Sequence, residues 1–139
     1  AAAESGTLRE SVVYWNNSTN DFVGAGSAGY YTQGGPPNEF GRLLNETFRD
    51  RRIAFNVHVA YHTETSVRRR TMVYMGSPTD NAVVATQTVT LFNETQLSAP
   101  GATLNVSEAD ANGEFYASDV SPGNSLFNVV EVQLVTWRM

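Results

Sequence analysis

The stretch from Ile53 to His62 reads IAFNVHVAYH, and its side chains alternate between two kinds. Ile53, Phe55 and Val57 begin a bulky apolar row, which continues at positions 59 and 61. Alanine, asparagine and histidine occupy the positions in between. Because successive side chains of a β-strand point to opposite faces, this period of two predicts a strand with one apolar face on the core.

Further strands are predicted on both sides of this stretch. Residues 71–75 form the return strand, and residues 82–92 and 128–138 are long segments in which β-branched residues are frequent. A short strand is predicted over 12–15, before a turn rich in asparagine. The segment 93–128 is polar and interrupted by Pro-Gly and Asn-Gly pairs, so we expect loops there.

One amphipathic helix is predicted from Pro37 to Asp50. Apolar residues recur at helical spacing from Phe40 to Phe48, and Asn38 can cap the first turn. Gly41 weakens this helix and is expected to let another element approach closely. The alanine-rich start, residues 1–10, predicts a second, short helical segment.

Long strands that do not alternate with helices are typical of an α+β domain. We therefore expect an antiparallel sheet of about 4–5 strands with one main amphipathic helix packed on one face, plus the short N-terminal helical segment. The chain has 139 residues, so residues 1–139 are expected to form a single domain.

The charge and cysteine content exclude several classes of function. All nine basic residues are arginine, against 14 acidic residues and a formal net charge of −5. A domain with a net negative charge binds nucleic acid poorly, because neutralising the phosphates needs a positive surface. The absence of lysine is typical of a GC-rich genome or of a salt-loving source. There is no cysteine, which excludes disulfides, thiolate nucleophiles and cysteine-based zinc sites.

The pattern Asn-x-Ser/Thr, the acceptor motif for N-linked glycans, occurs five times in the sequence. Composition alone gives roughly two such motifs by chance. The excess favours a secreted, glycosylated surface protein, although asparagine followed by serine or threonine also forms turns. The candidate glycosylation sites are Asn16, Asn17, Asn45, Asn93 and Asn105.

Three patterns suggestive of ligand binding have simpler interpretations. The Gly-x-Gly-x-x-Gly pattern of residues 24–29 lacks the flanking strand and helix that a dinucleotide site needs, so it predicts a loop. His58 and His62 are four positions apart, which on a strand separates their Cα atoms by ~13 Å and prevents chelation of one ion. We expect both histidines on an exposed sheet face. Arg68–Arg70 is expected to form a solvated hairpin.

No reactive centre is predicted. The acidic segment 108–119 does not follow the order of a calcium-binding EF-hand loop, so it is interpreted as a solvated loop, with a weak cation site as the alternative. The sequence contains neither a nucleophile elbow nor a histidine–acid pattern. We therefore expect a protein that is not an enzyme, with no catalytic residues, no cofactor and no resident metal.

Several segments together resemble a family of haloarchaeal surface proteins of the type IV pilin-like kind. The resemblance covers most of the chain and lies in residues 1–8, 13–16, 30–37, 39–48, 53–57, 128–132 and 137–139. It implies the soluble head domain of an extracellular subunit, at the cell surface or in a pilus filament. The membrane-anchoring apolar helix of such proteins would lie upstream of residue 1, and the partners would be other pilin-like subunits or cell-surface components.

Two alternatives to this structural role remain at the level of sequence. A carbohydrate- or surface-binding module would use Trp15, Tyr30 and Tyr31 as stacking platforms, whereas the same aromatic residues in the core would exclude it. A secreted hydrolase would require two carboxylates, or a histidine and an acid, brought together by the fold.

Overall fold

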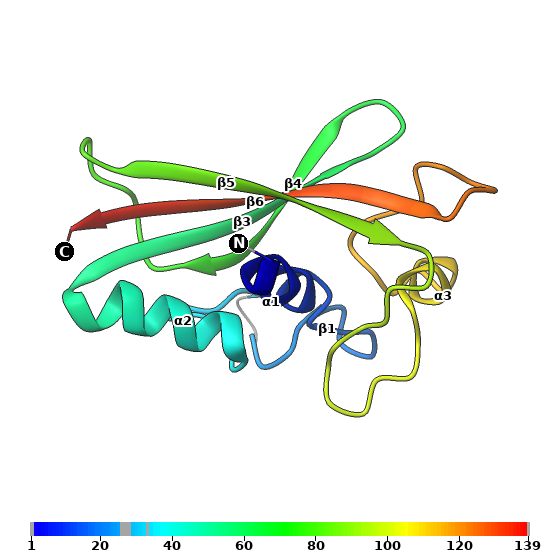
Figure 1. Cartoon of the computed structure of the whole chain (residues 1–139), viewed down its shortest axis with the longest axis horizontal. Coiled ribbons are helices and arrows are strands. Elements are labelled where there is room, and N and C mark those ends of the chain that lie inside the picture. The colour runs from blue at the N-terminus through cyan, green and yellow to red at the C-terminus, as the bar shows by residue number, and fades with distance from the viewer. Residues whose placement is uncertain (1, 26–28, 33, 139) are drawn as a thin grey trace.

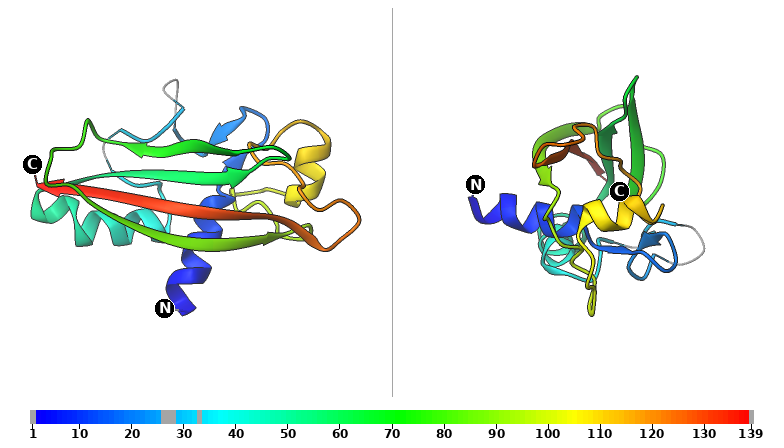
Figure 2. Two further views of the ribbon diagram at one scale, coloured as in Figure 1. Left: turned by 90° about the horizontal axis from the view of Figure 1, so that it is seen from above. Right: turned by 90° about the vertical axis from the view of Figure 1, so that its right-hand side faces the viewer.

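The computed structural model describes residues 2–25, 29–32 and 34–138. Its largest unit is a twisted four-stranded sheet in which every neighbouring pair of strands is antiparallel. The helices lie on one side of this sheet (Figures 1 and 2). In chain order the elements are α1 (Ala2–Val12), β1 (Trp15–Asn16), β2 (Asp21–Phe22), α2 (Glu39–Thr47), the 3-10 turn η2 (Arg49–Arg51), β3 (Ile53–His62), β4 (Val67–Tyr74), β5 (Val83–Phe92), α3 (Val106–Ala111) and β6 (Leu126–Arg138).

The sheet order is β4-β3-β6-β5, so β3 and the C-terminal strand β6 are central and β4 and β5 are the edges. A separate two-stranded hairpin pairs β1 with β2. The predicted α+β class with an antiparallel sheet is therefore confirmed. The predicted strand Ile53–His62 coincides with β3, and β5 and β6 differ from their predicted bounds by one or two residues.

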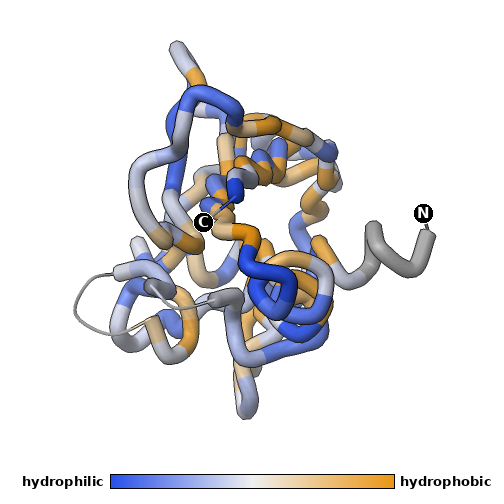
Figure 3. Tube along the Cα trace, turned by 90° about the vertical axis from the view of Figure 1, so that its left-hand side faces the viewer, coloured by the Kyte–Doolittle hydropathy of each residue, from blue (hydrophilic) through white to orange (hydrophobic). Residues whose placement is uncertain are grey.

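The core fills the space between the helices and the inner face of the sheet, defined here as the face that carries Phe55, Val57 and Val59. These three side chains are fully buried. Leu8 of α1 and Leu44 of α2 belong to the same cluster, so both helices contribute to it. Figure 3 shows apolar residues both along the strands of the sheet and along the helices.

Helix α2 begins as its sequence predicts. The Asn38 side-chain oxygen accepts a hydrogen bond from the Gly41 N–H at 3.1 Å, which satisfies one of the free donors of the first turn. Phe40 and Leu44 face the core. The α-helix ends at Thr47 rather than at Asp50, because the chain tightens into η2 and Arg52 adopts a left-handed conformation.

Three sequence predictions of local structure are wrong. The expected strand 12–15 is short, because α1 continues through Val12 and only Trp15–Asn16 pairs with β2. The arginine run 68–70 lies within β4, and the hairpin turn spans 63–66 instead. The polar segment 93–128 contains helix α3, which a reciprocal capping box between Asn105 and Glu108 stabilises.

None of the helices among the described residues is both long and apolar enough to cross a membrane.

Candidate functional site

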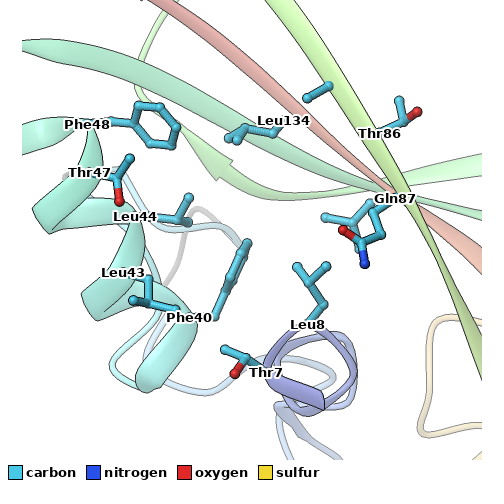
Figure 4. A pocket seen from close by; sticks show the side chains of 12 residues that line it. Thr7, Leu8, Phe40, Leu43, Leu44, Thr47, Phe48, Thr86, Gln87 and Leu134 are labelled. Atoms are coloured by element: carbon cyan, nitrogen blue, oxygen red, sulfur yellow. The ribbon is translucent and has the colours of Figure 1, made fainter. Parts of the chain in front are cut away.

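An apolar groove lies between helices α1 and α2 and the inner face of strands β5 and β6 (Figure 4). Its volume is about 300 Å³. Figure 4 shows Leu8 of α1 and Phe40 of α2 on its lower side, with Leu134 of β6 and Gln87 of β5 above them. The lining residues are Thr7, Leu8, Phe40, Leu43, Leu44, Thr47, Phe48, Ala85, Thr86, Gln87, Val132 and Leu134.

The groove exists because the helices cover only part of β5. Val89 and Leu91, in the second half of the strand, are buried, whereas residues 83–88 are exposed. The described residues that line the groove include no carboxylate, histidine or basic side chain. The lining therefore suits apolar contact and offers no group for acid–base chemistry.

The structure corrects the expectation that both histidines are exposed. His62, at the end of β3, is exposed, but His58 is only 7% exposed. Because β3 is a central strand, His58 is flanked by Thr71 of β4 and Gln133 of β6, and its Nδ1 lies 3.1 Å from the Thr71 hydroxyl. The two histidines lie on one strand and do not converge.

Burial, and then the positive charge of Arg69, lower the pKa of His58 below its ordinary value of 6.5. The unfolded chain therefore binds a proton at a pH where the folded chain does not. We expect the free energy of unfolding to fall as the pH drops from 7 to about 5.5, and His58→Gln to flatten this dependence. The same change at exposed His62 is the control. Urea titrations at each pH measure the effect, and equal slopes for all three proteins would contradict it.

The three aromatic residues proposed as a stacking platform do not form an exposed surface. Trp15 and Tyr31 are buried, and the Tyr31 hydroxyl donates to the Val23 carbonyl. Burial raises the pKa of Tyr31, so this phenol is neutral. Tyr30 packs edge-on against Tyr74 with ring centroids 5.8 Å apart. Two of the three rings thus belong to the core, and the three together cannot stack on a sugar.

In the arginine run 68–70, one residue has a structural role and the other two are solvated. Arg68 and Arg69 are exposed, whereas Arg70 is partly buried. The Arg70 guanidinium lies 5.0 Å from the centre of the Trp15 ring, in a cation–π contact.

Part of the glycine-rich pattern, residues 26–28, lies outside the described residues.

The acidic segment 108–119 uses its carboxylates locally. Glu108 accepts from the Asn105 N–H, Asp110 from the Asp119 N–H, and Asp119 from the Ser121 N–H. Residues 2–25, 29–32 and 34–138 contain no group of three or more acidic or histidine side chains arranged to hold a metal ion.

The five candidate glycosylation sites differ in how their amides are held. Asn17 lies in the turn between β1 and β2, and Asn16 accepts the Ser18 N–H at the start of that turn. The Asn45 oxygen accepts the Gly35 N–H, and the Asn105 oxygen caps α3. Asn93 is the most constrained: its Nδ2 donates to the Asn124 carbonyl at 2.6 Å, and its Oδ1 is buried.

These features define the class of the molecule: an α+β domain with an open apolar groove and a set of candidate glycan acceptors outside it. A sequence model of the protein family DUF7288, a family of unknown function, matches residues 1–136, so the chain belongs to that family. No curated protein and no solved structure shows significant similarity to it.

Proposed function

We propose that this chain is the extracellular head domain of a pilin-like subunit, with a structural rather than an enzymatic role, displayed on a cell surface or in a filament. The observation that carries the proposal is the position of α1. Its C-terminal part packs against the sheet through Leu8 and Val12, while its N-terminal end projects away from the body (Figure 2). A helical continuation upstream would leave the domain without meeting the sheet.

The groove is consistent with this role because its lining offers apolar contact area without reactive groups. The partners in this proposal are other subunits of the same kind or further surface components. The excess of glycan acceptor motifs supports an extracellular location, and the arginine-only basic content supports an archaeal, salt-loving source.

Localisation tests the proposal. Antibodies raised against the 139-residue domain are applied to intact source cells and imaged by immunogold electron microscopy. We expect labelled filaments or a labelled cell surface, and recovery of the protein in the fraction sheared from cells. Labelling confined to the interior of sectioned cells would overturn the proposal. A strain lacking the gene is the matched control for antibody specificity.

Glycan occupancy provides a separate prediction. We expect a glycan in the turn at Asn16–Asn17 and none at Asn93, because a sugar on the Asn93 Nδ2 would occupy the space of the Asn124 backbone. Peptide mass spectrometry of the native protein measures both positions. The double change Asn16→Gln and Asn17→Gln should remove glycan mass, whereas Asn93→Gln should leave it unchanged. A glycopeptide at Asn93 together with unmodified Asn16 and Asn17 would contradict this assignment.

A further inference from the structure

The two edges of the main sheet are built differently. The β4 edge carries the charged run Arg68–Arg70. It is also covered by the loop at Tyr31, which forms an isolated bridge to β4. The Tyr31 N–H donates to the Met72 carbonyl at 2.9 Å, and the Tyr31 carbonyl accepts the Tyr74 N–H at 2.9 Å. Charges and a covering segment are the usual protections of an edge strand against pairing with another chain.

Among the described residues, neither protection is present at the β5 edge. Its sequence from Val83 to Phe92 contains no charged residue and no proline, and it consists mainly of valine and threonine. Val83 and Val84 are 65% and 61% exposed. A ten-residue, uncharged, β-branched edge strand is a template for the addition of another strand.

The backbone groups that point outward along β5 can be assigned from the hydrogen bonds at its ends. In an antiparallel sheet the N–H and C=O of a residue point to the same side, and this side alternates along the strand. The Thr90 carbonyl accepts a hydrogen bond from the Arg9 Nε at 3.4 Å, so the backbone N–H and C=O of Thr90 point away from β6. Because this direction alternates along the strand, the backbone groups of Val84, Thr86 and Thr88 also point away from β6.

The open stretch of β5, residues 83–89, has a definite centre. On one side it is closed by the contact between Arg9 and Thr90, and on the other by the turn in which the Ala82 N–H donates to the Thr79 carbonyl. Thr86 is the middle residue of the open stretch. A symmetric, antiparallel pairing of two identical edges therefore places Thr86 opposite its own copy and Val84 opposite Thr88.

We propose that the occupant of this edge is a second copy of the chain, which pairs β5 with β5 in antiparallel orientation about a two-fold axis at Thr86. Charge complementarity supports a second copy as the occupant. Exposed Asp80 precedes the open stretch and exposed Arg9 lies at its other end, so the two-fold brings the Asp80 of each copy beside the Arg9 of the other. The paired strands form one continuous eight-stranded sheet, four strands from each copy.

Helix α1 adds to the same interface. In both views of Figure 2 its N-terminal end projects beyond β5 on the inner side of the sheet. The added strand of the second copy lies over these projecting turns. Because Ala85, Thr86 and Gln87 of β5 also line the groove, the pairing brings the α1 of one copy to the open side of the groove of the other.

Light scattering coupled to size exclusion tests the inference on the 139-residue chain at concentrations up to about 1 mM. We expect a dimer for the wild type. Thr86→Lys and Thr86→Glu each place like charges directly opposite one another and should weaken the dimer by at least about fivefold. An equimolar mixture of the two variants should dimerise again. The matched control is Thr65→Lys, in the exposed β3–β4 turn, which should leave dimerisation unchanged.

A monomeric wild type over this range would overturn the inference, and so would a dimer that both Thr86 variants leave intact. Hydrogen exchange provides a measurement without substitution. The amides of Val84, Thr86 and Thr88 should exchange more slowly as the protein concentration rises, and concentration-independent exchange would also overturn the inference. These outcomes do not depend on where the protein resides, so they stay distinct from the test of the proposed function.

Discussion

Gly41→Ala should destabilise the domain by about 3 kcal/mol or more, although the same change in an open helix stabilises by up to ~1 kcal/mol. The reason for the reversal is the close approach of the preceding chain. A Cβ at position 41 would lie 1.6 Å from the Pro36 carbonyl oxygen and 2.7 Å from its carbon. These atoms belong to the backbone, so no side-chain rotation relieves the clash.

The chain before α2 cannot easily move aside. The Pro36 carbonyl accepts the Asn38 N–H at 2.8 Å, and the Gly35 N–H donates to the Asn45 side chain. Relief of the clash would therefore break the hydrogen bonds that hold residues 35–38 against α2. The sequence predicted a close approach at Gly41, and the structure confirms it and identifies the approaching element as the residues just before α2.

Urea denaturation measures this effect. Thr47→Ala, at an exposed residue of the same helix that lines the open groove, is the matched control and should be neutral or slightly stabilising. Because Gly41→Ala removes no side chain, any loss of stability reports the clash rather than a cavity. A variant as stable as the control would show that the contact between 36 and 41 is not as tight as the structure describes.

The strands were the most predictable part of this fold. The alternation in Ile53–His62 distinguishes two faces of the sheet, one that packs against the helices and one on the opposite, outer side, and this difference is local in sequence. The same alternation does not reveal whether the second face is buried. His58 is buried because β3 lies between β4 and β6, and the position of a strand within a sheet is a tertiary property.

The ends of the helices were less predictable, for identifiable reasons. Helix α1 continues to Val12 because Leu8 and Val12 are one turn apart and both reach the core, which outweighs the strand preference of the valines. Helix α3 has only six residues, so it shows too little periodicity to detect. Its capping box, Asn105 with Glu108, was a usable signal that the surrounding Pro-Gly and Asn-Gly pairs obscured.

The groove could not be predicted from any single segment. Its lining combines α1, α2, β5 and β6, which are separated by up to most of the chain length. Each lining residue, Leu8 or Leu134 for example, has an ordinary core pattern in its own element. What creates the groove is the mismatch between the length of β5 and the area that the helices cover, and this mismatch appears only once the elements are assembled.

The residues that leave the β5 edge unprotected, in contrast, can be identified in the sequence. The sheet topology is needed to show that they lie at an edge. An uncharged run of valine and threonine at 83–92 predicts a strand of any kind, central or peripheral. Only the sheet order shows that this strand is an edge, while the arginine-bearing strand is the opposite edge. The asymmetry between the two edges is the basis for the proposed pairing of two copies.

The second large effect is expected at Trp15, where Trp15→Ala should cost about 3–5 kcal/mol. The Trp15 side chain is 2% exposed and packs edge-to-face on Phe22 at 5.1 Å and on Phe115 at 6.1 Å between ring centroids. Its Nε1 donates to the Glu114 carbonyl at 2.8 Å. One ring thus connects the β1–β2 hairpin to residues 114–116, about a hundred positions later in the chain.

Trp15→Phe separates the contribution of the ring from that of its hydrogen bond. The phenyl ring keeps part of the aromatic packing but leaves the Glu114 carbonyl without its donor and reduces the contact with Arg70, so a loss of ~1–3 kcal/mol is expected. Tyr30→Ala, at a partly exposed ring that packs against Tyr74, is the control and should cost less than about 1.5 kcal/mol. Chemical denaturation followed by far-ultraviolet circular dichroism measures all three variants without relying on tryptophan fluorescence. If Trp15→Ala cost no more than Tyr30→Ala, Trp15 would not hold the hairpin to the later segment, and the packing described for this end of the core would be incorrect.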